Sequence, residues 1–165
     1  MVVIVFGLPG SGKSYFAAKL AEKLGAIYIN SDVLRLQMFA TRTYTDAEKL
    51  LVYDAMAAAM TEALTSNSSI VLDATFYKEA IRNAFEQKAA AFNEQIHYIE
   101  VTAPEDLIAE RVNRPRRHSE ANYDVYLKLK GEFEPMQQEH LVLVSSNSDI
   151  TPFLTQAIGY INNSK

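Results

Sequence analysis

The sequence contains no cysteine. This absence excludes disulfide frameworks, thiolate zinc sites, iron–sulfur clusters and cysteine nucleophiles. It is compatible with a reducing cytoplasm, where we expect the protein to be located. The histidines are few and stand far apart, at His97, His118 and His140. Because no His-Glu-x-x-His spacing occurs, we do not expect a histidine zinc site.

A long apolar run and an excess of positive charge are also missing. The apolar segment Met1–Phe6 lacks a positively charged flank and is far too short to span a bilayer, so we expect no membrane association. Sixteen Lys and Arg against twenty Asp and Glu give a net charge of -4, which argues against a basic protein that coats nucleic acid or anionic lipid. The 165 residues are 48% hydrophobic and 22% charged, a composition that fits one globular domain over residues 1–165.

Strand and helix patterns alternate along the chain. Apolar and β-branched runs predict strands over 2–6, 26–29, 70–73, 96–101 and 141–144. Helical spacing predicts helices over 13–24, 33–39, 45–64, 81–92, 123–133 and 153–161, and a further helix that begins at 104. This alternation predicts an α/β fold of three layers, α/β/α, around a five-stranded parallel sheet. Since ligands bind beyond the carboxyl ends of such strands, we expect function in the loops 7–14, 30–35, 73–78, 102–122 and 145–149.

The first of these loops carries a phosphate-binding motif. Residues 7–14 read Gly-Leu-Pro-Gly-Ser-Gly-Lys-Ser and match G-x-x-x-x-G-K-[ST] between a predicted strand and a predicted helix. In this P-loop, backbone N–H groups and the helix N-terminus attract phosphate, Lys13 reaches the β- and γ-phosphates, and the Ser14 hydroxyl can bind Mg²⁺. We therefore predict a P-loop NTPase fold with ATP and Mg²⁺ as cofactors. The predicted nucleotide-binding residues are Gly7, Pro9, Gly10, Ser11, Gly12, Lys13, Ser14, Tyr15 and Arg111.

A carboxylate and a cation follow the second predicted strand. Asp32 and Arg35 are three residues apart and share a helix face if a helix begins there. A kinase needs a base or orienting group for the acceptor hydroxyl and a cation near the acceptor or the moving phosphoryl group. The alternative is that Asp32 caps the helix and Arg35 lies on the surface. We predict that Asp32 is catalytic and that both side chains contact the substrate.

A second carboxylate, Asp73, ends the third predicted strand in Ile70-Val71-Leu72-Asp73-Ala74-Thr75. An acid in this place is how a Walker-B aspartate reaches the Mg²⁺ of a P-loop NTPase. The alternative is an aspartate that caps a loop. We predict Asp73 as a metal ligand with Ser14, and Thr75 and Arg82 as substrate-binding residues, although Arg82 fits a surface cation equally well.

Four of the seven arginines, Arg111, Arg114, Arg116 and Arg117, fall in a segment without acids. Outside residues 111–117 the chain has 12 cations and 20 acids. Arginine suits bidentate phosphate contact, so we predict an arginine-rich lid over 111–122 in which Arg114 or Arg117 acts in catalysis by steadying the transferred phosphoryl group. A solvated basic loop and a nucleic-acid patch are the alternatives.

Together these segments resemble a family of small P-loop kinases, in which Gly-x-Pro-Gly-Ser-Gly-Lys-Ser is followed by Asp-x-x-Arg, an Asp-Ala-Thr strand end and an arginine lid. The resemblance covers nearly the whole chain. It extends to ATP-binding AAA-type and zeta-toxin-like kinases, the kinase domain of polynucleotide 5′-hydroxyl kinases and chloramphenicol phosphotransferases. It implies that Asp32 is the base, that Arg35 contacts the acceptor and that lid arginines contact ATP phosphates. Ser119-Glu120-Ala121 and Phe133-Glu134-Pro135 resemble the family's lid pattern, where Ser-Asp-Ala is commoner than Ser-Glu-Ala.

We therefore expect an ATP- and Mg²⁺-dependent kinase that transfers the γ-phosphoryl group to a hydroxyl of a small-molecule or nucleoside-like acceptor. Two alternatives stay open. A polynucleotide 5′-hydroxyl kinase needs only a few contacts to a nucleic-acid 5′ end, but the lysine surplus that would hold a long strand is missing. An NTP-binding switch protein would have the same P-loop without acceptor chemistry.

Overall fold

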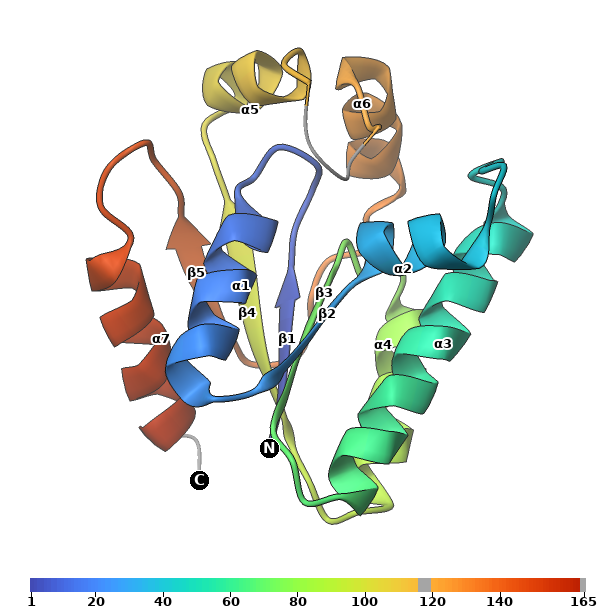
Figure 1. Cartoon of the computed structure of the whole chain (residues 1–165). Coiled ribbons are helices and arrows are strands. Elements are labelled where there is room, and N and C mark those ends of the chain that lie inside the picture. The colour runs from blue at the N-terminus through green and yellow to red at the C-terminus, as the bar shows by residue number, and fades with distance from the viewer. Residues whose placement is uncertain (116–119, 164–165) are drawn as a thin grey trace.

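The computed structural model describes residues 1–115 and 120–163 and is built around five parallel strands (Figure 1). The strands are β1 (Val2–Phe6), β2 (Ile27–Asn30), β3 (Ile70–Ala74), β4 (Ile96–Thr102) and β5 (His140–Val144). Their order in the sheet is β2-β3-β1-β4-β5. Register places Val5 and Asn30 on either side of Asp73 at the carboxyl end of the sheet. The predicted five-stranded parallel sheet is confirmed.

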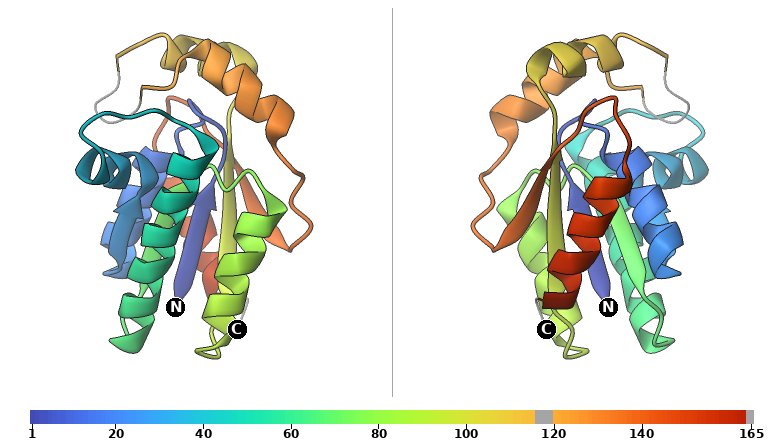
Figure 2. Two further views of the ribbon diagram at one scale, coloured as in Figure 1. Left: turned by 90° about the vertical axis from the view of Figure 1, so that its right-hand side faces the viewer. Right: turned by 90° about the vertical axis from the view of Figure 1, so that its left-hand side faces the viewer.

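Helices cover both faces of the sheet, as the two further views show (Figure 2). Every residue of β1 is fully buried, because alternate side chains enter two separate cores. Val2, Ile4 and Phe6 pack with α3 (Asp46–Thr65) and α4 (Glu79–Ala90). Val3 and Val5 pack with α1 (Lys13–Leu24) and α7 (Thr151–Asn163). The predicted α/β/α layering is therefore confirmed.

Three further helices lie toward the carboxyl end of the sheet: α2 (Ser31–Met38), α5 (Glu105–Val112) and α6 (Tyr123–Glu132). Ile108, Val112 and Tyr126 of α5 and α6 form a small core with Leu8 of the P-loop, so the two helices pack directly over that loop. Since α5 continues to Val112, Arg111, at the start of the predicted lid, lies on a helix. The lid itself stays a prediction.

The start of α2 also differs from the sequence-based prediction, which began this helix at Val33. The helix begins at Ser31, because the Asn30 Oδ1 atom accepts a hydrogen bond of 2.9 Å from the Val33 amide and caps it. Asp32 therefore lies in the first helical turn rather than at the cap. Within residues 1–115 and 120–163, none of the helices has the length and apolar character that crossing a membrane would require.

Candidate functional site

The P-loop connects β1 to α1 and is enclosed by two other segments. Gly10 and Gly12 have positive φ angles of 82° and 93°. A Cβ atom on Gly10 would lie 2.8 Å from Val112 Cγ1, and one on Gly12 would lie 3.1 Å from Ser145 Oγ. Glycine is needed at both positions because the backbone is left-handed and its neighbours are close. The loop is thereby fixed between α5 and the segment that follows β5, with the N-terminus of α1 at its centre.

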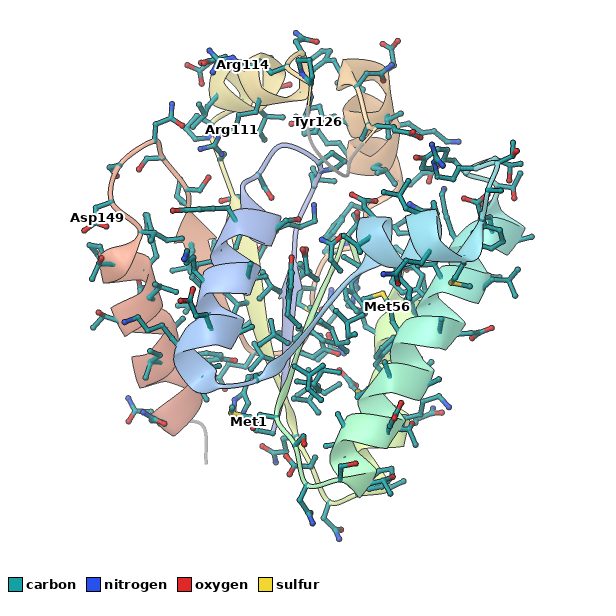
Figure 3. The ribbon with its side chains drawn as sticks, in the orientation of Figure 1. Met1, Met56, Arg111, Arg114, Tyr126 and Asp149 are labelled. Atoms are coloured by element: carbon teal, nitrogen blue, oxygen red, sulfur yellow. The ribbon has the colours of Figure 1, made fainter. Side chains whose placement is uncertain are left out.

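Arg111 joins these segments (Figure 3). Its Nη1 atom donates hydrogen bonds to the carbonyl oxygens of Gly10 and Ser11, at 3.2 Å each, and to Ser145 Oγ at 2.8 Å. Its Nη2 atom donates to the Ser146 carbonyl and to Asn147 Oδ1. Burial lowers the pKa of the Arg111 guanidinium. Arg111 therefore orders the P-loop backbone from the side of α5.

A cavity of about 380 Å³ lies against this arrangement. Gly12, Tyr15 and Arg111 line it together with residues 145–148. Tyr15 is 64% exposed and was predicted to bind nucleotide. Ser145, Ser146 and Asn147 were not predicted individually, since the sequence marked 145–149 only as a loop after a strand. Their place in a loop after a strand of the parallel sheet was the one feature of the sequence that indicated these residues.

Asp73, at the end of β3, is completely buried. Its Oδ2 atom accepts a hydrogen bond of 2.8 Å from the Tyr28 hydroxyl and another from Asn30 Nδ2. Burial raises the pKa of Asp73, opposed by the nearby charge of Lys13 and by hydrogen bonds from Ser14, Tyr28 and Asn30. Tyr28 and Asn30 were not predicted as site residues, because nothing in the local sequence pairs β2 with β3.

Two oxygen atoms in this cluster could hold Mg²⁺. Asp73 Oδ1 is buried and has no hydrogen-bond partner within the described residues, and Ser14 Oγ lies 3.3 Å from Asn30 Nδ2. Mg²⁺ takes oxygen ligands and usually binds through one or two carboxylates, keeping several waters. Ser14 and Asp73 therefore fit the ion. Over residues 1–115 and 120–163 the protein has no group of three or more histidines and acids that could form an all-protein metal cage.

A second cavity, of about 230 Å³, lies on the other side of the P-loop. It brings together Lys13 with the predicted substrate-binding residues Asp32, Arg35 and Thr75, from three different loops and helices. We call it the acceptor cavity. The rest of its lining comes from the P-loop, α2, the α2–α3 connection, α3, the β3–α4 connection, and α6 with the residues just before it. These residues are Pro9, Ser31, Tyr44, Lys49, Val52, Tyr53, Tyr77, Glu120, Ala121, Val125, Lys128 and Leu129.

Arg35 is held between two carboxylates at this cavity. Its Nη1 atom lies 3.2 Å from Asp32 Oδ1, and its Nε atom lies 3.1 Å from Glu48 Oε1. Asn30 is the helix cap, and Asp32 lies in the first turn of α2, which fits the alternative of an acid at the helix N-terminus. The other part of that alternative, Arg35 as a surface residue, does not fit, because the Arg35 side chain is 11% exposed.

Glu48 was not predicted as a site residue. Its spacing from Thr45 suggested a capping box, and Thr45 does accept a hydrogen bond from the Glu48 amide. The Glu48 carboxylate instead accepts hydrogen bonds of 2.6 and 2.8 Å from the amide and hydroxyl of Thr43, and it is 4% exposed. Burial opposes ionisation of Glu48, but these hydrogen bonds and the charge of Arg35 bring its pKa below the usual value.

The connection between α2 and α3 also reaches the segment before α6. The Tyr44 ring stacks under Arg35, 4.9 Å from the guanidinium, and the Tyr44 hydroxyl donates to Glu120. Arg42 Nη2 lies 2.6 Å from Glu120 Oε1. Hydrogen bonds from Arg42 and Tyr44 lower the pKa of Glu120 to about 2. These contacts close one side of the acceptor cavity.

The structure corrects the prediction for Arg82, which is fully buried and lines neither cavity. Its guanidinium donates to the carbonyl oxygen of Phe76 at 2.8 Å and to those of Glu134 and Pro135 at 3.1 Å. It is therefore neither a substrate ligand nor a surface cation. Arg82 instead links the turn after β3 to the segment after α6. Its hydrogen bonds satisfy three carbonyl groups that would otherwise lack a donor.

One predicted catalytic arginine, Arg114, lies among the described residues, and it does not reach the P-loop. Arg114 is 71% exposed, lies 2.5 Å from Glu110 and lines neither cavity. Figure 3 places it on the far side of α5 from Arg111. Arg117, with Arg116, lies among residues 116–119, outside the described residues. A catalytic role of Arg114 or Arg117 stays a prediction.

Solved structures with the same fold are numerous. The structure superposes on a gluconokinase from Sinorhizobium meliloti with a TM-score of 0.74 and 18% identity, over 98% of this chain and 91% of that chain. Kti12 from Chaetomium thermophilum, in complex with ADP-AlF3, gives a TM-score of 0.77 and 19% identity over 99% and 98% of the two chains. The APS kinase of Mycobacterium tuberculosis, in complex with AMPPNP and APS, gives 0.73 and 19% over 98% and 96%.

A search of curated protein sequences gave no match. The fold is that of small P-loop kinases, as the sequence motifs predicted. A family model described as an AAA domain matches residues 2–136, which include the P-loop, Asp32, Asp73, α5 and α6. The chain therefore belongs to this family of AAA domains.

Proposed function

We propose that the protein is an ATP- and Mg²⁺-dependent kinase that phosphorylates a hydroxyl group of a small-molecule acceptor. The observation that carries this proposal is the acceptor cavity, in which Asp32 of α2 and Lys13 of the P-loop line the same enclosed space. A nucleotide-binding protein without acceptor chemistry has no need of such a cavity. The proposal assigns one side of the P-loop to the nucleotide and the other to the acceptor.

On the nucleotide side, the backbone amides of Gly10–Ser14 and the Lys13 ammonium hold the phosphates. The cavity lined by Tyr15 and Arg111 receives the remainder of the nucleotide. Ser14 and Asp73 would hold Mg²⁺, which would supply positive charge to offset that of the nucleotide phosphates. Asp73 must be ionised for this role. Burial raises the pKa of Asp73, and the charge of Lys13 acts against burial in favour of the ionised form.

On the acceptor side, Asp32 orients the hydroxyl and takes its proton, and Arg35 keeps the carboxylate directed into the cavity. The acceptor oxygen forms a bond to the γ-phosphorus, while the bond between that phosphorus and the β,γ-bridging oxygen breaks and ADP leaves. Catalysis is then mainly positioning and charge stabilisation. Arg114 or Arg117 stabilises the negative charge of the transferred phosphoryl group if the lid brings either of them to the site.

The size of the acceptor cavity supports a small acceptor over a polynucleotide. Its volume of about 230 Å³ lies below the usual range for pockets that take drug-sized ligands. Two of the similar structures, the gluconokinase and the APS kinase, are named as kinases of small molecules. A polynucleotide 5′-hydroxyl kinase is the second candidate, because a terminal nucleoside alone could enter such a space.

The experiment is transfer of labelled γ-phosphate from ATP, with Mg²⁺, to a panel of sugars, sugar acids, nucleosides, antibiotics and 5′-hydroxyl oligonucleotides. We expect label in at least one small hydroxyl compound. Label found only in oligonucleotides would replace the proposal with the second candidate. ATP binding or hydrolysis with no labelled acceptor in the whole panel would favour a nucleotide-binding switch.

A further inference from the structure

The acceptor cavity is more positively charged than the protein around it. Four cationic side chains line it, against the two carboxylates Asp32 and Glu120, in a chain whose net charge is -4. Lys13 has a role toward ATP, and Arg35 is paired with both Asp32 and Glu48. The excess therefore rests on the remaining two cations, Lys49 and Lys128.

The two carboxylates of the lining do not neutralise these lysines. Asp32 is ion-paired with Arg35, and Glu120 is ion-paired with Arg42 and hydrogen-bonded by Tyr44. Each acid of the lining thus lies beside an arginine from α2 or the connection after it, although Asp32 shares Arg35 with Glu48. A pair of charges that is already matched adds little to the potential felt by a third group.

Lys49 and Lys128 come from different helices, α3 and α6. The Lys49 side chain is 15% exposed. Its carboxylate partner among the described residues, Asp46 at 3.2 Å, is 87% exposed and lies outside the cavity lining. Its ammonium lies 5.3 Å from the centre of the Tyr77 ring, which also lines the cavity. Lys128 is exposed and makes no hydrogen bond or ion pair within the part of the chain that the structure describes.

We infer that the acceptor carries an anionic group, a carboxylate or a phosphate, which Lys49 and Lys128 bind while its hydroxyl lies at Asp32. This inference rests on the proposed function and narrows its substrate class to small hydroxylated anions. Two ammonium groups from different helices that line one partly enclosed space favour an anion there, where charge interactions are stronger than in water. The aromatic ring of Tyr77 gives the carbon skeleton an apolar surface to pack on.

The first test compares acceptors that differ in one charged group. The matched pairs are sorbitol with gluconate, glycerol with glycerol 3-phosphate, and adenosine with AMP. Each compound is assayed for label transfer. Its binding is measured by calorimetry with ADP and Mg²⁺ present. The anionic member of at least one pair is expected to have a kcat/KM about tenfold or more above that of its neutral partner. Gluconate distinguishes a carboxylate from the phosphate of the other two anions.

The second test removes the lysine charges. Lys49→Gln and Lys128→Gln are each expected to raise the KM of the anionic acceptor about tenfold, with kcat and the KM for ATP within about twofold of the wild-type values. The KM of the neutral partner should not change. Lys88→Gln, on the exposed side of α4, is the matched control and should leave all of these values at the wild-type level.

The outcomes separate this inference from the proposed function. Neutral acceptors that are phosphorylated as well as their anionic partners, or lysine variants that affect both equally, would overturn the inference and leave the kinase in place. Anion binding that is weakened by the lysine variants, without transfer to any acceptor, would support an anion site and overturn the kinase. The absence of both transfer and anion binding would overturn the two together.

Discussion

The two sides of the P-loop are built in different ways. On the nucleotide side, one continuous run of sequence, residues 7–14, supplies the motif, and neighbours such as Arg111 and Ser145 hold its backbone. On the acceptor side, the cavity is assembled from side chains of α2, α3, α6 and the turn after β3. Backbone groups bind what all nucleotides share, the phosphates, whereas scattered side chains can differ between proteins that share the fold.

Under the proposed function, the nucleotide side determines the reaction class and the acceptor side determines the substrate. The fold extends over nearly the whole length of kinases named for gluconate and for APS, at below 20% identity. A shared P-loop with a changed acceptor cavity would account for one fold with several substrates. Mutations on the two sides should therefore give different kinetic signatures, and the following predictions are ordered from the largest expected effect to the smallest.

Lys13→Ala should abolish function on both sides at once, because Lys13 is the one charged side chain that belongs to the P-loop and also lines the acceptor cavity. We expect kcat/KM for label transfer to fall by about a thousandfold or more. Lys23→Ala, at the exposed end of α1, is the control. Near-normal transfer by the Lys13 variant would show that phosphate binding does not depend on this motif.

Asp32→Asn should affect the acceptor side alone. We expect label transfer to fall by about a hundredfold or more, because the amide cannot take the hydroxyl proton, while ATP binding is unchanged. Single-turnover transfer and calorimetry with ATP measure the two quantities. Asp54→Asn, an exposed acid on α3, serves as the control. Transfer by Asp32→Asn at the wild-type rate would remove Asp32 as the base.

Glu48→Gln tests whether a buried residue outside the cavity positions Arg35. Losing the charge leaves Arg35 with Asp32 as its one carboxylate partner, so we expect kcat/KM for the acceptor to fall by about tenfold and the KM for ATP to stay within about twofold. A role in stability alone would lower the melting temperature without this selectivity for the acceptor. Glu62→Gln, exposed on the same helix, should change neither quantity.

The smallest effect is expected at Glu120, which is exposed. Its pKa of about 2 lies below the usual value, so its ion pair with Arg42 stabilises the protein above about pH 4.5, and this contribution is lost as the pH falls toward 2. The melting temperature of wild type should exceed that of Glu120→Gln by a constant small amount between pH 7 and 5. That difference should narrow below about pH 4.5. A difference that already narrows between pH 7 and 5 would contradict this account of the pair.

The parts that sequence predicted well are those in which neighbouring residues determine the structure. Alternating patterns predicted the strands and helices, and the P-loop motif predicted a loop whose glycines must adopt positive φ. Asp32 and Arg35 were predicted together because residues three positions apart on a helix lie on the same face.

The parts that sequence missed depend on contacts between distant segments. Tyr28 meets Asp73 because β2 and β3 are adjacent in the sheet, and Ser145 meets Arg111 because β5 ends beside the P-loop. Arg82 is a residue type that often binds ligands, but it is buried in the core, and two of the three carbonyl groups that it binds come from the distant segment after α6. Such partners are determined by the strand order, which the local pattern does not contain.

The central claim is that Lys13 and Asp32 serve one reaction in one cavity. Its most direct test is a crystal structure with Mg²⁺, a non-hydrolysable ATP analogue and the acceptor that the label-transfer panel identifies. We predict that an acceptor hydroxyl lies within about 3 Å of the Asp32 carboxylate and faces the γ-phosphate beside Lys13. An acceptor bound outside this cavity, with Asp32 in contact with neither ligand, would contradict the claim.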